Sequence, residues 1–66
     1  MRIGECIKNA RKANGKTQIE LAKSAGIAVN SLRLYEANKR EPSLKQLRKI
    51  AYALGLGLHC FLEKTR

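Results

Sequence analysis

The chain has 66 residues, enough for one small domain but too few for a second core or a deeply enclosed catalytic cavity. Fourteen Lys and Arg residues against five Glu and no Asp give a formal net charge of +9, which predicts a polyanionic partner or a membrane surface. The 44% apolar fraction is mostly Leu, Ala and Ile, so the composition favours an all-α domain over a sheet.

The cysteines and histidine predict no metal centre. Cys6 and Cys60 lie almost the whole chain apart, with no C-x-x-C pair and with His59 as the single histidine. Both thiols are interpreted as small buried side chains, and no disulfide is expected. No signal peptide is expected, and no apolar run approaches the roughly 20 residues of a membrane span, which predicts a reduced, soluble, intracellular setting.

The first predicted helix begins near the N-terminus. Apolar and small side chains recur there at spacings of three and four, the pattern of one helix face: Ile3, Cys6, Ile7, Ala10 and Ala13. Asn14 and Gly15 follow, and Gly15 is the expected left-handed residue at the helix end.

A second helix is predicted to start at Thr17. Thr17 and Glu20 form a T-x-x-E capping box, in which each side chain satisfies a backbone N–H that has no partner inside the helix. The helix continues through Leu21 and Ala22 and ends after about two turns at Gly26. A third helix is predicted next, and Asn38 stands where its left-handed end residue is needed.

A polar connector, residues 39–42, separates the third helix from a fourth. Pro42 disfavours helix at this point, and Ser43 with Gln46 supplies an S-x-x-Q capping box. The apolar positions of the fourth helix follow at helical spacing: Leu44, Leu47, Ile50, Ala51 and Leu54. Gly55 and Gly57 end it, and residues 58–62 are predicted to form a short terminal turn or helix.

The middle of the chain has the arrangement of a helix-turn-helix: a short capped helix, a tight turn and a second helix of similar length. Ala22 is small enough for the two helices to cross closely, and Gly26 supplies a positive φ in the turn. Ile27 and Leu32 then hold the second helix against the core. Its outer face is left free to enter a DNA major groove.

These residues resemble the phage-repressor and Cro-type (Xre-like) helix-turn-helix family. The similarity runs from Ile7 to Leu62 and is strongest in four ordered segments, residues 17–27, 31–36, 42–44 and 50–55. It implies an all-α, compact five-helix domain of the lambda-repressor-like type over residues 1–66, with the helix-turn-helix unit at about residues 17–37. It also implies a cytoplasmic, sequence-specific regulator of transcription, of the repressor type, that binds double-stranded DNA.

The resemblance assigns DNA contacts position by position, with residues 29–37 as the recognition helix in the major groove. The base-contacting set is Gln18, Val29, Asn30, Arg33 and Leu34. Asn30 suits adenine and Arg33 suits guanine, whereas Val29 and Leu34 suit a thymine methyl group. The alternatives are that Val29 or Leu34 merely packs and that Arg33 meets only phosphate. At the position of Gln18, family members contact a phosphate and support the recognition helix.

Two further sets of residues follow from the resemblance. The phosphate-binding set is Thr17, Asn38, Lys39 and Arg40, with plain solvated charge as the alternative for the last three. Arg11 and Glu36 are expected to form a structural ion pair between the first and third helices.

The positive charge is divided unevenly along the chain. Residues 1–16 carry a net charge of +4, residues 17–36 carry none, residues 37–50 carry +4 and the remainder +1. This partition is expected if flanking segments neutralise phosphates while the neutral centre discriminates between bases.

The sequence departs from the family pattern at four positions. Lys16 replaces an apolar residue, which removes a hydrophobic staple, and Ala28 replaces a capping Ser or Thr at a cost of about 1 kcal/mol. Asn38 replaces the usual Gly, which is tolerable because Asn adopts left-handed φ readily, and Gly57 replaces a Ser or Thr cap.

A homodimer on a two-fold operator is expected from the excess of apolar residues near the C-terminus: Leu56, Leu58, Phe61 and Leu62. The alternative is that they close the core. His59 is expected at the surface or the dimer edge. The alternative function is an antitoxin or partner-binding regulator, and a third is nucleic-acid binding by charge alone. With one histidine and no Asp, the sequence supports neither an enzyme nor a cofactor.

Overall fold

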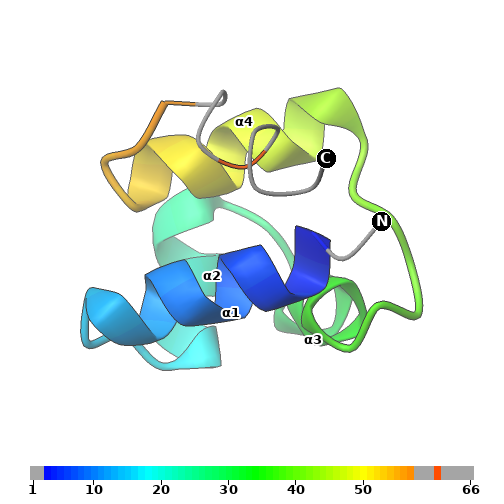
Figure 1. Ribbon diagram of the computed structural model, residues 1–66, viewed down its shortest axis with the longest axis horizontal. Coiled ribbons are helices and arrows are strands. Elements are labelled where there is room, and N and C mark those ends of the chain that lie inside the picture. Colours follow the sequence, from blue (N-terminus) through cyan, green and yellow to red (C-terminus); the bar gives the residue numbers. More distant parts are fainter. Residues whose placement is uncertain (1–2, 58–60, 62–66) are drawn as a thin grey trace.

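The computed structural model describes residues 3–57 and residue 61, and this part of the chain contains four α-helices and no strand (Figure 1). They are α1 (Ile3–Ala13), α2 (Gln18–Ala25), α3 (Val29–Glu36) and α4 (Leu44–Ala53). The all-α class is therefore confirmed. The expected fifth helix falls at residues 58–62, of which only Phe61 lies within the described part, so the count of five is not reproduced.

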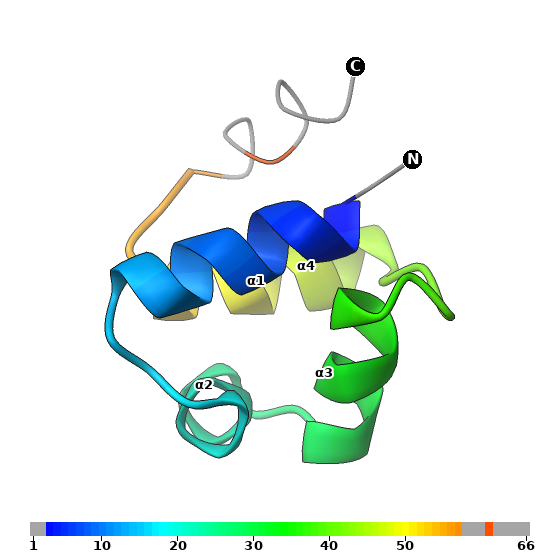
Figure 2. The same ribbon diagram turned by 60° about the horizontal axis from the view of Figure 1, so that its bottom comes forward.

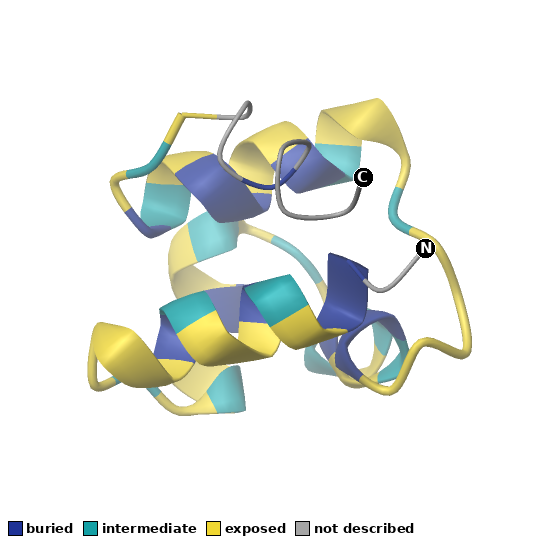
Figure 3. Cartoon of the chain, in the orientation of Figure 1, coloured by how far each residue is buried: buried dark blue, intermediate teal, exposed yellow. Residues whose placement is uncertain are grey.

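The four helices enclose one apolar centre. α3 packs against α1 and α2, and α4 packs against α2. Figure 2 shows α1 lying across the top with α4 behind it, while α2 and α3 stand below. Each helix turns a buried stripe inward and an exposed stripe outward (Figure 3). The largest fully buried side chains come from every helix and from the C-terminal region: Ile7, Leu21, Leu32, Ile50 and Phe61.

The ends of α1 and α2 follow the local sequence signals. Gly15 has φ 67° after α1, and Gly26 has φ 71° after α2. At the start of α2 the Glu20 backbone N–H donates to Thr17 Oγ1 at 3.1 Å, and the Thr17 backbone N–H donates to Glu20 Oε1 at 2.8 Å. The predicted capping box is confirmed in both of its bonds.

Helix α3, which the sequence predicts to be the recognition helix, begins without a side-chain cap, because Ala28 occupies the N-cap position. It ends one residue earlier than predicted, at Glu36, and Asn38 adopts the expected left-handed conformation with φ 59°. Ala22 in α2 is buried, and α2 packs against α3.

Two predictions for α4 need correction. Ser43 Oγ accepts from the Gln46 backbone N–H at 3.2 Å, but only this half of the predicted capping box is found among the described contacts. Leu44 is 53% exposed instead of being part of the core. It stands at the first residue of α4, and the first α4 side chain to be buried is Leu47.

One residue of the expected dimer interface is buried within the chain, as the alternative of core closure predicts. Phe61 is 1% exposed and closes the core of a single chain, so its side chain offers a partner no surface. Leu56 is partly buried and packs against the same core. Leu58 and Leu62 lie outside the described residues, as do His59 and Cys60.

Neither a membrane span nor a metal centre is present in the described part of the chain. None of its four helices has the length and apolar character needed to cross a bilayer. Residues 3–57 and 61 also contain no group of three His, Cys, Asp or Glu side chains that could hold a metal ion. Cys6 is a free, half-buried thiol on α1.

Candidate nucleic-acid interface

The exposed face of α3 presents two of the predicted base-contacting residues together. Asn30 and Arg33 lie one turn apart, and Arg33 Nη1 donates to Asn30 Oδ1 at 3.3 Å. Both residues are exposed. The bond is long and solvent-exposed, so either side chain is easily released to a stronger partner. Asn30 and Arg33 therefore form one polar unit at the surface, with the Asn30 amide hydrogens and most guanidinium donors still open.

The apolar members of the predicted base-contacting set are less exposed. Val29 is half-buried and packs against the core, so part of its side chain is structural. Leu34 is also half-buried. The structure thus leaves each of them some free surface beside Asn30 and Arg33, and it shows a packing role for Val29.

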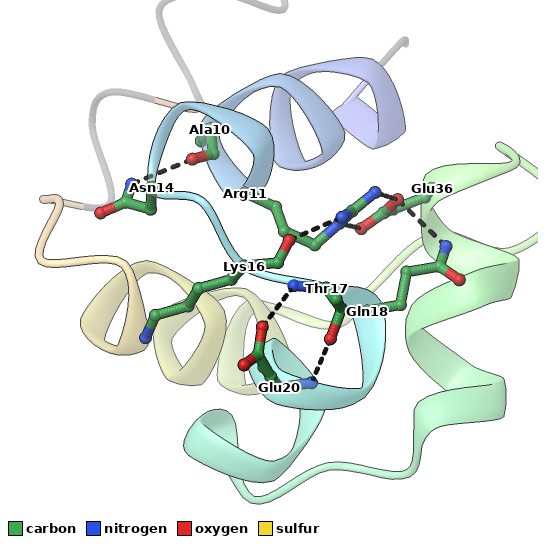
Figure 4. A network of polar contacts seen from close by, with 8 residues as sticks. All are labelled: Ala10, Arg11, Asn14, Lys16, Thr17, Gln18, Glu20 and Glu36. Atoms are coloured by element: carbon green, nitrogen blue, oxygen red, sulfur yellow. Dashed lines mark hydrogen bonds and ion pairs between the residues drawn. The ribbon is translucent and has the colours of Figure 1, made fainter.

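The inner side of α3 is fixed by a buried carboxylate (Figure 4). Arg11 Nε donates to Glu36 Oε2 at 2.8 Å and Arg11 Nη2 donates to Glu36 Oε1 at 3.1 Å, with the two side chains 11% and 3% exposed. This is the two-bond geometry in which guanidinium and carboxylate interact most strongly. Its position matches the ion pair expected from the sequence, and it joins the last residue of α3 to α1.

Gln18 adds a contact from α2 to the same carboxylate. Its Nε2 donates to Glu36 Oε1 at 3.1 Å. Because a carboxylate only accepts hydrogen bonds, Glu36 orients the Gln18 amide with its nitrogen inward. One N–H and the carbonyl oxygen of Gln18 remain open for another partner. The supporting role expected for Gln18 is thus present in the geometry, whereas its DNA contact stays a prediction.

Lys16 makes two contacts that sequence reasoning missed. Its backbone carbonyl accepts from Arg11 Nη1 at 2.8 Å, and its Nζ donates to the Ala53 carbonyl at 3.3 Å, at the C-terminal end of α4. A cation is favourable there because the last carbonyls of a helix lack internal partners. Lys16 therefore ties the loop between α1 and α2 to α4. The only sequence signal was its departure from the apolar family pattern.

The predicted phosphate-binding residues all lie at the surface but differ in what they have free. Lys39 and Arg40 are exposed. The backbone N–H groups of Asn38 and Lys39 donate to the Tyr35 and Leu34 carbonyls at 3.1 and 3.0 Å. At residues 38 and 39, therefore, only side-chain donors are open to a phosphate.

Two of these side chains already have a structural contact. Thr17 is exposed, and its hydroxyl oxygen accepts the capping bond of α2. The carbonyl oxygen of the Asn38 side chain accepts from the Gly4 backbone N–H at 3.1 Å. The Thr17 hydroxyl hydrogen and the Asn38 amide group remain as possible donors.

One carboxyl group has a shifted pKa. The backbone and side chain of Thr17 hydrogen-bond to Glu20 and lower the pKa of its carboxyl group below the ordinary value, with a smaller contribution from the charge of Lys16. Glu20 is therefore ionised at neutral pH and acts in the helix cap.

Comparison with known proteins identifies similar chains. A family described as helix-turn-helix matches residues 7–59. The transcriptional repressor RstR of the cryptic phage CTXphi, from Vibrio cholerae, is 40% identical over 58 residues, which are 88% of this chain and 52% of RstR. The transcriptional regulator SinR of Bacillus subtilis is 36% identical over 63 residues, 94% of this chain and 57% of SinR. The chain thus spans about half the length of these relatives.

Solved structures of SinR are similar in fold as well. A crystal structure of SinR in complex with DNA has a TM-score of 0.87 and 38% identity, covering 91% of this chain and 97% of that one. A SinR–SinI complex has a TM-score of 0.90 and 35% identity, covering 97% of this chain and 63% of that one. These relatives are regulators and not enzymes, in agreement with the absence of catalytic residue pairs from the sequence.

Proposed function

The chain belongs to the helix-turn-helix family of the phage-repressor type, and we propose that it is the sequence-specific, double-stranded DNA-binding part of a transcriptional repressor. One observation carries the proposal. The outer face of α3 presents Asn30 and Arg33 to solvent while Glu36, at the end of the same helix, is fixed by α1 and α2. A helix held on one side and polar on the other is suited to a major groove.

The proposed division of labour separates base contacts from phosphate contacts. Asn30 binds adenine and Arg33 binds guanine, each through paired hydrogen bonds, and the free surfaces of Val29 and Leu34 meet thymine methyl groups. The side chains of Lys39 and Arg40, just beyond α3, neutralise phosphates. The similarity to DNA-bound SinR supports this arrangement.

The finer parts of the proposal concern assembly and location. We place the protein in the cytoplasm, as a homodimer on a two-fold operator with half-sites about 34 Å apart, the repeat of the double helix. Leu56 and the apolar residues Leu58 and Leu62 supply the proposed interface, without Phe61. A fifth helix near residues 58–62 belongs to the same proposal, on the family resemblance.

A selection from random DNA tests the proposal directly. The wild-type protein is expected to enrich a two-fold sequence motif. On that motif Asn30→Ala and Arg33→Ala should each weaken binding by about 1–3 kcal/mol per lost base contact, while binding to random DNA changes little. Asn9→Ala, exposed on α1, and Arg48→Ala, exposed on α4, are matched controls that should leave both affinities nearly unchanged.

Two results would overturn the proposal. If no motif is enriched, or if Asn30→Ala and Arg33→Ala weaken binding to random DNA as much as to the selected site, the protein binds nucleic acid by charge alone. The selection also decides symmetry, because a single unrepeated half-site would exclude the two-fold operator.

A protein partner is the second candidate, with the chain as an antitoxin or partner-binding regulator. The observation that favours it is the fold similarity to SinR in its complex with the SinI protein, over 97% of this chain. Copurification of an acidic partner that competes with the selected DNA would support this function. A protein that purifies alone and binds DNA tightly would exclude it as the primary one.

A further inference from the structure

The start of α1 rests directly on the end of α3. Gly4, in the first turn of α1, is buried, and its backbone N–H donates to Asn38 Oδ1 at 3.1 Å. There is no room for a side chain at this point. A β-carbon on Gly4 would lie 2.9 Å from the Glu36 carbonyl oxygen and closer still to the Tyr35 carbonyl oxygen, both of them backbone atoms of the recognition helix.

This contact stabilises both helix ends that meet there. The first N–H groups of α1 have no partner within their own helix, and Asn38, in the turn after α3, accepts from one of them in the manner of an N-cap. The last carbonyls of α3 are negative and face the positive N-terminal end of α1. Because Gly4 has no side chain, the two helix ends can approach this closely. The Gly4–Asn38 contact is called the junction.

Asn38 is held in place by its own backbone. Its left-handed conformation, with φ 59°, is stabilised because its N–H donates to the Tyr35 carbonyl and the next N–H, of Lys39, donates to the Leu34 carbonyl. The side chain therefore leaves α3 in one direction. Since Oδ1 accepts from Gly4, the amide is oriented so that the nitrogen, Nδ2, points away from the buried glycine.

The position of the junction matters because it lies at the C-terminal end of α3, while Val29 and Leu32 pack against the core along the rest of the helix. Near its C-terminal end Tyr35 and Glu36 are buried, whereas its first residue follows the uncapped Ala28. Asn30 lies in the first turn of α3 and Arg33 lies near its middle. A small rotation of α3 about the junction would displace the side chains of Asn30 and Arg33. Binding sites need their contacting groups held within about 0.5 Å of the productive geometry.

We propose that Gly4 and Asn38 are positioning residues that set the angle of the recognition helix, so that they determine DNA sequence specificity without contacting a base. This inference rests on the proposed function. The two polar atoms of the Asn38 amide have different roles in this proposal. Oδ1 accepts from the Gly4 N–H and holds α1 against the end of α3, whereas Nδ2 is free to donate to a phosphate.

The test compares binding to the selected DNA with binding to random DNA, for variants first shown by circular dichroism to be folded at the temperature used. Gly4→Ala places a methyl group against the Tyr35 carbonyl and should lower the ratio of specific to random affinity at least tenfold. Asn38→Gly keeps the left-handed turn and removes Oδ1, and it should lower the ratio about three- to tenfold. This second variant keeps the proposal testable if Gly4→Ala does not fold.

Asn38→Asp separates positioning from phosphate contact. It keeps the oxygen that accepts from Gly4 but removes the amide donor and adds a negative charge, so affinity should fall for both DNAs while their ratio stays near the wild-type value. Asn14→Gly is a matched control, since Asn14 caps the other end of α1 through its contact with the Ala10 carbonyl. This variant should leave the ratio unchanged.

The outcomes distinguish the inference from the function on which it rests. If wild-type protein shows no preference for any sequence, the proposed function itself is wrong. If the wild type is specific and folded Gly4→Ala and Asn38→Gly keep the wild-type ratio, the junction does not position the recognition helix. If Asn38→Asp lowers the ratio as far as Asn38→Gly does, the effect belongs to the amide donor, which also overturns the inference.

Discussion

Glu36 and Arg11, 25 positions apart in the sequence, are joined inside the protein by two hydrogen bonds of 2.8 and 3.1 Å. Gln18 donates to the same carboxylate, so three donors from α1 and α2 meet on one side chain of α3. The buried charge of Glu36 is thereby balanced and hydrogen-bonded, which is the condition for a charged group to be tolerated in a core.

Removing one partner of this pair should be strongly destabilising. Arg11→Met keeps the aliphatic stem but leaves Glu36 buried without its counter-charge, and the free energy of unfolding should fall by about 3–5 kcal/mol. Urea unfolding measures the change. The double variant Arg11→Met, Glu36→Met should lose less than the sum of the single losses, because no uncompensated charge remains. Strict additivity would show that the two side chains are energetically independent.

Capping the recognition helix should stabilise the protein. Ala28 provides no side-chain acceptor for the first turn of α3, so Ala28→Ser should raise the free energy of unfolding by about 1 kcal/mol. Ser43→Ala is the reverse experiment, because Ser43 caps α4 through the Gln46 backbone N–H, and it should cost about 1 kcal/mol. If Ala28→Ser has no effect in thermal unfolding, the first turn of α3 gains nothing from a cap.

The Glu20 contribution to stability should depend on pH. Hydrogen bonds from Thr17 lower the pKa of this carboxyl group in the folded protein, so its stabilisation is present above the ordinary glutamate pKa and is lost as pH falls through the lower, folded-state pKa. The difference in melting temperature between the wild type and Glu20→Ala should therefore be largest at neutral pH and shrink in acid. A difference that stays constant from pH 7 to pH 3 would contradict this.

The salt dependence of DNA binding should identify the phosphate contacts. Replacing both Lys39 and Arg40 by Ala should reduce the slope of log affinity against log salt by about 2, equally on selected and random DNA. The matched control is the double variant Arg48→Ala, Lys49→Ala. These two exposed residues lie on α4, which is at the opposite edge of the domain from α3 in Figure 1. Equal changes in slope for both double variants would mean that total charge, and not these two contacts, sets the slope.

Features that depend on neighbouring residues could be predicted from the sequence. The capping box of Thr17 and Glu20 spans four residues, and the left-handed residues Gly26 and Asn38 are determined by the turn in which they stand. The ion pair of Arg11 and Glu36 is not local, and it was expected only because of the family resemblance.

Features that depend on distant packing could not be predicted. Lys16 Nζ donates to the Ala53 carbonyl, 37 residues away, and no pattern of neighbouring residues in the sequence predicts this hydrogen bond. From the sequence alone, Gly4 is a residue of low helix propensity. The reason for a glycine at this position is the close approach of the end of α3, which only the folded structure shows. Apolar character alone also did not show that Leu44 is exposed while Phe61 is covered by its own chain.

The burial of Glu36 changes the electrostatics of the surface that DNA would approach. Along the sequence, residues 17–36 sum to zero charge, because Lys23 and Arg33 balance Glu20 and Glu36. In the folded protein the buried Glu36 carboxylate is paired with Arg11, which lies outside residues 17–36. Lys23, Arg33 and Glu20 remain as the charged side chains at the surface of the helix-turn-helix, so this surface carries a net positive charge and α3 exposes no carboxylate that would repel a phosphate.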